Sequence, residues 1–360
     1  MTRRGTALIA VASVAALLTV AACGGKASDA ATATATGSTS LKGRTLNVVT
    51  WGGVWTDATK KYFLEPFAAE TGVKVNYTIS GTDPTSTVLL QEQQGSVQID
   101  LTDSSSAGVL EEKGFMEHFP DELMQAIKQT SRPDAFGDYY LELGSTATLI
   151  VCNPELIKKC PSNAKEFWDV KGFPGDRAVA TTYSSAMAFA LMADGVPKDQ
   201  LFPMDVERSI KKLKELKPHV KTWPSSGAQQ QQVMIDKEVG MSFMWNGRAF
   251  VVKRDNMPNL ILNWGDSTLT TGNGWAVPKG APNKDVAFAA IKWVAEHPEA
   301  QAKWSEALTY PTPTKDLLTL VPKDIADALP GAHDPAVIPG LALAKQADEM
   351  RKAWQNFLTQ

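Results

Sequence analysis

The sequence has little cysteine and little histidine. It contains three cysteines and four histidines in 360 residues, and the histidines are scattered through polar or proline-rich stretches. It has no Gly-x-Ser-x-Gly elbow, no Gly-rich phosphate loop followed by Lys-Ser/Thr, and no His-x-x-His metal pair. The chain therefore lacks a recognisable catalytic or metal-binding motif, and we expect neither an enzyme nor a bound metal or other cofactor.

A concentrated basic segment is also missing. Without residues 1–22 the chain carries 34 basic against 39 acidic residues, so its net charge is near −5. Nucleic-acid binding normally needs a concentrated positive surface, and we do not expect it here. The composition, 43% hydrophobic and 21% charged, is that of an ordinary globular protein. The chain is longer than one hydrophobic core usually allows, which predicts two lobes.

Only one long hydrophobic run is present, and it lies at the N-terminus. Arg3 and Arg4 precede residues 7–22, which are nearly all Ala, Val, Leu or Ile and end in small residues. A run this short and early is typical of an export signal. The segment Val20-Ala-Ala-Cys23 resembles a bacterial lipobox, which implies removal of residues 1–22 and lipidation of Cys23. The exported protein would then be anchored by lipid to the outer face of the cell membrane. A plain secretory signal with an incidental cysteine is the alternative.

The two other cysteines and the segment after the leader fit an exported protein. Residues 23–43 are rich in Ala, Thr, Ser and Gly without a hydrophobic period, which predicts a flexible tether. Cys152 and Cys160 are close in sequence, and an oxidising compartment favours a disulfide between them. Two free thiols are the alternative.

In the rest of the chain, strand patterns alternate with helical ones. The strand patterns lie at 45–51, 73–79, 97–102, 147–151, 179–182, 239–245, 260–264 and 274–278. The helical patterns lie between about 54 and 70, at 85–93, before Gly114, at 185–193, 209–216, 285–307 and 341–357. Alternation of this kind predicts an α/β fold with mainly parallel sheets, arranged as two α/β units with a cleft between them.

Several segments together resemble the extracellular solute-binding proteins of ABC importers, within the spermidine/putrescine-binding group. They are Leu46-Asn-Val-Val-Thr-Trp-Gly-Gly53, Pro66-Phe-Ala-Ala-Glu-Thr-Gly-Val-Lys-Val75, Phe167-Trp-Asp-Val170, Phe173-Pro-Gly175, Asp236-Lys-Glu-Val-Gly-Met-Ser-Phe-Met-Trp-Asn-Gly-Arg248 and Val277-Pro-Lys-Gly-Ala-Pro-Asn283. The resemblance implies a two-lobed periplasmic-binding-protein-like fold that holds a small solute in the cleft. It also implies a non-catalytic receptor that closes by a hinge and docks on membrane permease subunits with a cytoplasmic ATPase.

This resemblance places the lobe boundaries and the hinge. We expect a first lobe from 44–145 and 276–312, and a second lobe from 146–275 and 313–360. Strands that cross between the lobes would carry the hinge near Gly144–Thr148 and Gly272–Val277.

The candidate ligand-binding residues follow the ends of strands, because ligands of open α/β sheets bind beyond the carboxyl ends of the strands. Glycines let the backbone approach a ligand, tryptophan faces stack on it, and hydroxyls at a helix N-terminus suit polar groups. The candidates are Trp51, Gly52, Gly53, Trp55, Ser104, Ser105, Thr182, Tyr183, Trp245, Asn246, Arg248, Asn273 and Trp275. For each tryptophan a place in the core is the alternative, and for the serines a simple helix cap.

The residues that should pair with a polyamine differ from those of the polyamine-binding group. That group uses cleft carboxylates, because a desolvated cation needs a compensating charge. This chain has Thr181 and Thr182 at one such place, and Asn273 and Trp275 at the other. Asp103 and Asp266 are candidate substitutes. Arg248, if it faces the cleft, favours a carboxylate or phosphonate instead. The expected ligand is therefore polyamine-like or another small organic solute.

Two other kinds of protein stay open at this point. One is a surface lipoprotein that acts as a sensor or adhesin without transport. The other is an exported hydrolase, which the absence of a catalytic motif disfavours.

Overall fold

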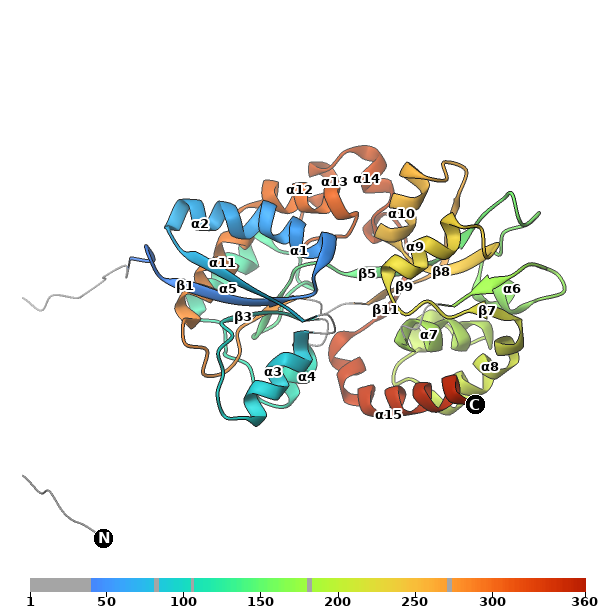
Figure 1. Ribbon diagram of the computed structural model, residues 1–360, viewed down its shortest axis with the longest axis horizontal. Coiled ribbons are helices and arrows are strands. Elements are labelled where there is room, and N and C mark those ends of the chain that lie inside the picture. The colour runs from blue at the N-terminus through green and yellow to red at the C-terminus, as the bar shows by residue number, and fades with distance from the viewer. Residues whose placement is uncertain (1–39, 81–83, 105–106, 180–182, 271–273) are drawn as a thin grey trace, which may run out of the picture. The chain divides into compact units, whose positions relative to one another are not determined.

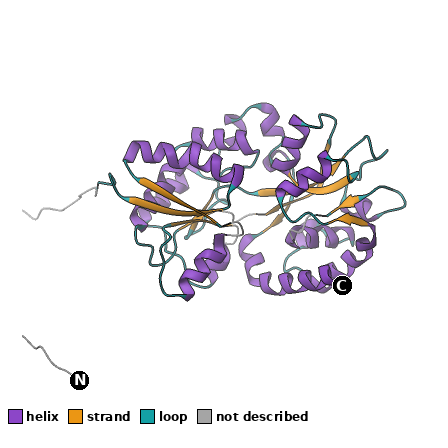
Figure 2. Ribbon diagram, in the orientation of Figure 1, coloured by secondary structure: helices purple, strands orange, loops and turns teal. Residues whose placement is uncertain are grey.

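The computed structural model describes residues 40–80, 84–104, 107–179, 183–270 and 274–360. Residues 41–360 form one compact unit that contains two β-sheets with helices around them (Figures 1 and 2). The export signal, the tether and Cys23 lie outside the described residues, so these three stay predictions.

The first sheet is built mainly from the N-terminal third of the chain. Its strand order is β2-β1-β3-β10-β4. The strands are β1 (Thr45–Thr50), β2 (Lys74–Ile79), β3 (Leu101–Ser104), β4 (Tyr140–Glu142) and β10 (Gly274–Ala276). β1 pairs in parallel with β2 and β3, whereas β10 runs antiparallel to β3 and β4.

Helices cover this sheet and close its core. They are α1 (Gly53–Thr59), a π-helical turn (Lys60–Leu64), α2 (Glu65–Thr71), α3 (Pro84–Gln93), α4 (Ala107–Glu112), α5 (Asp121–Thr130), α11 (Lys284–Glu296) and α12 (Pro298–Leu308). Phe63, Trp275 and Trp304 are almost fully buried at the centre. The Phe63 ring stacks on Trp304 and meets Trp275 edge-on, with ring centroids 6.0 Å apart in both pairs.

The second sheet has the order β11-β9-β5-β8-β6-β7. The strands are β5 (Thr146–Cys152), β6 (Arg177–Ala178), β7 (Val220–Thr222), β8 (Met241–Trp245), β9 (Ile261–Thr270) and β11 (Ala336–Ile338). Its core contains a stack of Phe167, Phe243 and Phe189, with successive ring centroids 4.2 and 4.1 Å apart.

The helices of the second half include α15, the last element of the chain. They are α6 (Ala164–Trp168), α7 (Tyr183–Ala193), α8 (Val206–Leu216), α9 (Gly227–Ile235), α10 (Asn246–Asp255), α13 (Leu317–Leu320), α14 (Lys323–Asp327) and α15 (Gly340–Thr359). Short 3-10 turns lie at Lys198–Gln200, Lys217–His219 and Pro330–Ala332. α15 packs on α7 and α8, and it also contacts α4 beside the first sheet.

The carboxyl ends of the strands in the two sheets face the same region of the molecule. β4 ends at Glu142 and β5 begins at Thr146, so residues 143–145 connect the two sheets directly. β9 and β10 are likewise separated by residues 271–273. Within the described strands, every antiparallel pairing involves β5 or β10. These two strands are the ones that directly follow the segments connecting the two sheets. The other described strands point their carboxyl ends toward these segments (Figure 1).

The α/β fold class and the two-sheet arrangement predicted from the sequence are confirmed, with local corrections. The single helix expected over 285–307 is two helices, because Pro298 lacks an amide hydrogen and breaks the run after His297. The strand expected from Val97 begins only at Leu101. The preceding Asp100 is fully buried and accepts hydrogen bonds from the backbone amides of Asn47 and Asn283, which holds this stretch out of the ladder.

A buried arginine holds the loop that precedes β6. Arg177 is 2% exposed, and its guanidinium donates hydrogen bonds to the backbone carbonyls of Phe167, Phe173 and Gly175. Burial lowers the pKa of this guanidinium. Since a guanidinium presents several donors in a fixed fork, one side chain satisfies three carbonyls that would otherwise lack partners.

Candidate functional site

The turn after β1 places four candidate residues at the edge where the sheets face each other. Trp51 is half-buried and follows the last residue of the strand. Gly52 and Gly53 have φ angles of 92° and 60°, a conformation that glycine adopts without strain. The Gly52 amide donates to Thr56 Oγ1 at 2.8 Å, which fixes the start of α1. The turn therefore presents Trp51 and exposed backbone at this edge.

Trp55 and a buried carboxylate form the inner part of this site. Asp103 is fully buried in β3, one residue from the end of the strand. Its Oδ2 accepts hydrogen bonds from the Trp55 indole and from Thr50 Oγ1, the latter at 3.2 Å. Ser104, the last residue of the strand, is also buried and bonds to Thr85. The first sheet thus ends in a buried carboxyl group that accepts hydrogen bonds from an indole and a hydroxyl.

On the second sheet, Tyr183 and Trp245 lie at the corresponding edge. Tyr183 is the first residue of α7 and Trp245 is the last residue of β8, and both are half-buried. The Trp245 amide donates to Gln230 Oε1 at 3.1 Å, which joins β8 to α9. Ser105, Thr182 and Asn273 lie outside the described residues, as does Thr181.

Arg248 lies where two helices begin. It is in the first turn of α10, and a Cβ on Gly227, the first residue of α9, would be 2.6 Å from Arg248 Nε. The guanidinium donates to Gln231 Oε1 at 3.2 Å and lies close to the hydroxyl of Tyr310. Helix N-termini carry partial positive charge, so a cation there is unfavourable unless an anion joins it. An anion would be favoured in this arrangement.

Tyr310 connects this arginine to the first sheet. Burial raises the pKa of the Tyr310 phenol to about 12, and Arg248 partly offsets the rise. The Tyr310 ring lies 5.9 Å from the Trp55 ring, which in turn meets Trp304 at 4.8 Å. The Tyr310–Trp55 pair therefore lies between Arg248 of α10 and the Asp103 carboxyl group of β3.

Two of the expected ligand-binding residues are engaged elsewhere. Trp275 is 1% exposed and packs on Phe63, so it belongs to the core of the first sheet. Asn246 is 1% exposed, and both ends of its side-chain amide bind backbone: Oδ1 accepts from the Ala147 amide, and Nδ2 donates to Thr309 O. We therefore leave both out of the ligand site.

Of the two acids considered as substitutes for the missing carboxylates, only Asp103 lies at the facing edges. Asp266 Oδ2 accepts a hydrogen bond of 2.7 Å from the Ala164 amide, at the start of α6. This bond caps the helix, as a carboxylate at a helix N-terminus commonly does.

Sequence reasoning missed Tyr310 as a candidate site residue. It lies just beyond the end of α12, where the chain leaves the first sheet for the second time. Pro311 and Pro313 follow it and indicate an extended segment after the helix. A tyrosine between a helix end and that segment was the one signal in the sequence.

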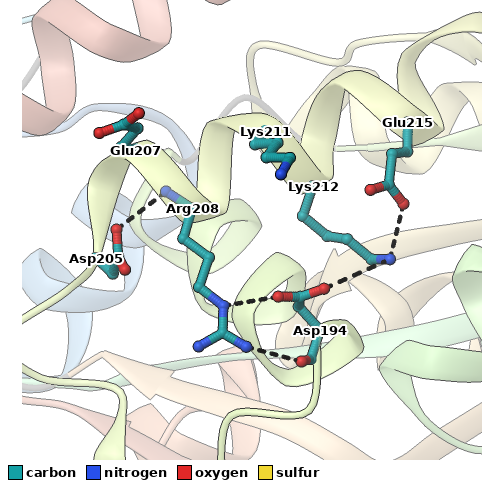
Figure 3. Close-up of a pocket in the computed structure, with 7 residues that line it drawn as sticks. All are labelled: Asp194, Asp205, Glu207, Arg208, Lys211, Lys212 and Glu215. Atoms are coloured by element: carbon teal, nitrogen blue, oxygen red, sulfur yellow. Dashed lines mark hydrogen bonds and ion pairs between the residues drawn. The ribbon is translucent and has the colours of Figure 1, made fainter.

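A hollow of about 410 Å³ lies away from these edges, along α8. Its lining is charged, and Asp194, Arg208, Lys212 and Glu215 form a chain of ion pairs in it (Figure 3). Arg208 Nε and Lys212 Nζ lie 2.6 and 3.8 Å from the Asp194 carboxylate, and Lys212 also pairs with Glu215 at 2.7 Å. The hydrogen bond from Arg208 lowers the pKa of Asp194. Because Asp194, Arg208, Lys212 and Glu215 pair with one another, we assign no ligand to this hollow.

Two searches bear on metals and on membranes. In the stretches that the structure describes, no group of three His, Cys, Asp or Glu side chains is placed to hold a metal ion. No helix of the same stretches is long and apolar enough to cross a membrane.

The family model for bacterial extracellular solute-binding proteins matches residues 63–331, about three quarters of the chain. The chain belongs to this family. The family is one of extracytoplasmic transport proteins, not of enzymes, and it implies binding of a small-molecule solute and delivery to an ABC permease. The match confirms the family expected from the sequence and does not favour a sensor, an adhesin or a hydrolase.

Curated and solved relatives of this solute-binding protein agree with that assignment. A γ-aminobutyric acid-binding protein of Pseudomonas aeruginosa is 28% identical over 298 residues, which are 80% of this chain and 82% of the relative. The spermidine/putrescine-binding periplasmic protein of Escherichia coli is 22% identical over 84% of this chain and 85% of its own. A solved γ-aminobutyric acid receptor superposes with a TM-score of 0.79 at 28% identity, covering 87% of this chain and 97% of its own.

Proposed function

We propose that this solute-binding protein captures a small amino acid of the γ-aminobutyrate type and delivers it to an ABC permease. The observation that carries the proposal is the position of Arg248 at the start of both α9 and α10, where positive charge gathers. A ligand carboxylate would neutralise that charge through the two parallel hydrogen bonds that a guanidinium offers.

The opposite end of the site supports a ligand that also carries an ammonium group. Asp103 ends the first sheet with a buried carboxylate, and the Trp55 and Tyr310 rings lie between it and Arg248. A desolvated ammonium needs such a carboxylate, and aromatic faces favour a cation or an apolar methylene chain. A diamine would instead place a second positive charge against Arg248, which disfavours putrescine and spermidine.

Replacing Asp103 with Asn tests the ammonium end. The amide keeps the size of the side chain and its bond from Trp55 but removes the charge. Because a hydrogen bond to a charged group contributes about 1.5–3 kcal/mol, we expect γ-aminobutyrate to bind about 10- to 100-fold more weakly in calorimetric titration. The matched control is Asp100→Asn, a buried carboxylate next to the same strand that accepts hydrogen bonds from Asn47 and Asn283. If Asp103→Asn binds as the unchanged protein does, Asp103 does not contact the ligand.

We propose that binding proceeds by closure of two lobes, 44–145 with 276–312 and 146–275 with 313–360, and that the solute is released unchanged. The hinge would use Gly144–Thr148 and Gly272–Val277, of which 272 and 273 lie outside the described residues. β10 pairs with β3 and β4 of the first sheet. This pairing supports moving the lobe boundary that precedes residue 276 to about residue 273, so that all of β10 belongs to the first lobe. Trp51, Gly52, Gly53, Ser104, Tyr183 and Trp245 would complete the ligand site. Ser105, Thr182 and Asn273 stay candidates from the sequence alone.

We also propose that the mature chain begins at Cys23, lipidated and anchored to the outer face of the membrane. The lipobox-like segment supports this, and the Ala/Thr/Ser/Gly-rich stretch to residue 43 would act as the tether.

A disulfide between Cys152 and Cys160 is the last part of the proposal. Their sulfur atoms lie at bonding distance and their Cα atoms are 5.8 Å apart, within the usual range for a disulfide. Closing so short a loop restricts the unfolded chain and should stabilise the protein by about 2–3 kcal/mol. We expect a reductant to lower the melting temperature of the protein but not that of a Cys152→Ala, Cys160→Ala double variant. Equal melting temperatures with and without reductant would show that no such bond forms.

A further inference from the structure

Three consecutive residues at the start of α10 contact one corner of the chain. The corner is Leu308–Tyr310, where α12 ends and the chain leaves the first sheet. Asn246 Nδ2 donates to Thr309 O at 2.6 Å, and the Arg248 guanidinium lies close to the Tyr310 hydroxyl. Gly247 lies against the Tyr310 ring so closely that a Cβ would be 2.8 Å from Cζ. α10 is therefore clamped to this corner by polar contacts and by close packing.

The same Asn246 side chain also holds the first crossing segment. Its Oδ1 accepts a hydrogen bond of 3.1 Å from the Ala147 amide, at the start of β5 and just beyond residues 143–145. One buried amide thus joins β8 and α10 of the second sheet to two crossings between the sheets. A carboxamide is suited to this, since it donates at one end and accepts at the other.

The corner itself is tied firmly to the first sheet. The backbone carbonyl of Ser305 in α12 accepts a hydrogen bond of 2.7 Å from the Thr309 amide. The Ser305 hydroxyl donates a hydrogen bond of 2.6 Å to Tyr310 O. Gly144 lies in residues 143–145, the first segment that connects the two sheets. A Cβ placed on it would be 2.7 Å from Trp304 Cη2 and 3.1 Å from Trp55 Cη2, so the glycine leaves room for these two rings. Rotation of the second sheet against the first would therefore strain the bond from Asn246 to Thr309.

We propose that Asn246 is a positioning residue, a latch that stabilises the binding-competent arrangement of the two sheets without touching the ligand. The inference rests on the proposed function, because it takes the arrangement that brings Arg248 to Tyr310 and Trp55 as the competent one. A latch of this kind acts on every ligand alike. If it is weakened, a smaller fraction of the protein is competent, and each apparent dissociation constant rises by the same factor.

The test compares Asn246→Ala with the unchanged protein, both beginning at Lys26 and so retaining the whole unit Leu41–Gln360. Three ligands of one class but different length are titrated by calorimetry: β-alanine, γ-aminobutyrate and 5-aminovalerate. We expect all ligands that bind the unchanged protein to bind the variant about tenfold more weakly, by a common factor. Small-angle scattering should show a more expanded variant without ligand and equal radii at saturation.

Asn263→Ala is the matched control. Asn263 also uses both amide ends on backbone, donating to Pro161 O and accepting from the Gly265 amide, each at 2.9 Å, but within the second half of the chain. It should lower the melting temperature without changing affinity. If Asn246→Ala does not fold, Asn246→Ser serves in its place, with a smaller common factor expected.

The outcomes separate the latch from the proposed function. Failure of the unchanged protein to bind any of the three ligands overturns the proposed ligand class, and with it the basis of the latch. Unchanged affinity in the Asn246 variant overturns the latch alone. A loss confined to one ligand also overturns it, because that result would place Asn246 in direct contact with the solute.

Discussion

Replacing Arg248 with Gln should weaken binding of γ-aminobutyrate about 100-fold, equivalent to about 2.7 kcal/mol. The guanidinium is the positive group at the joint start of α9 and α10, and it is held there by Gln231 and Tyr310. A neutral amide in its place loses the charge-assisted pair of hydrogen bonds to the ligand carboxylate. Calorimetric titration measures the change directly.

Arg254→Gln is the control for this experiment. Arg254 lies on the same helix and pairs with Asp255 near its end, with both side chains about half exposed. This substitution should leave affinity unchanged. An Arg248→Gln variant that keeps its affinity for γ-aminobutyrate would show that the carboxylate is bound elsewhere.

Replacing Arg177 with Met should lower the free energy of unfolding by about 3–5 kcal/mol. Methionine fills much of the volume but leaves the carbonyls of Phe167, Phe173 and Gly175 without their donor. Each buried acceptor left unpaired costs about 1–3 kcal/mol of stability, and the costs of the three carbonyls combine. Urea unfolding should show a lower midpoint with an unchanged slope.

Lys221→Met is the matched substitution on the surface nearby. Lys221 is half exposed and pairs with Asp176, a contact that contributes little in water. Lys221→Met should change the free energy of unfolding by no more than about 1 kcal/mol. Equal effects of the two substitutions would mean that the three carbonyls find other partners when Arg177 is absent.

The fold could be predicted because its signals are local and repeated. β1 has a mostly buried pattern, a glycine precedes each of β1 and β2, and α8 carries an apolar face with Val206, Leu213 and Leu216 buried. The break between α11 and α12 was missed although Pro298 is visible, because the apolar period continues on both sides of it. Asp100 shortened β3 through bonds to Asn283, which is 183 residues away and outside any local pattern.

The turns that carry the candidate residues could be located from the sequence, whereas the partners of their side chains could not. Strand ends identified the turns that carry Trp51, Trp245 and Arg248. Whether a residue faces a ligand or its own protein depends on the partner that folding brings to it. Asn246 meets Thr309, and Trp275 meets Phe63, through contacts that span many residues of sequence.

The most direct test of the account is a thermal shift of the unchanged protein with γ-aminobutyrate, butyrate, putrescine and spermidine. Butyrate lacks the ammonium group and putrescine lacks the carboxylate, so the set separates the two ends of the proposed ligand. A ligand at a hundredfold its dissociation constant adds about 2.7 kcal/mol, which raises the melting temperature by several degrees. The account predicts this shift with γ-aminobutyrate and little or none with the other three. A shift with putrescine or spermidine and none with γ-aminobutyrate would contradict it.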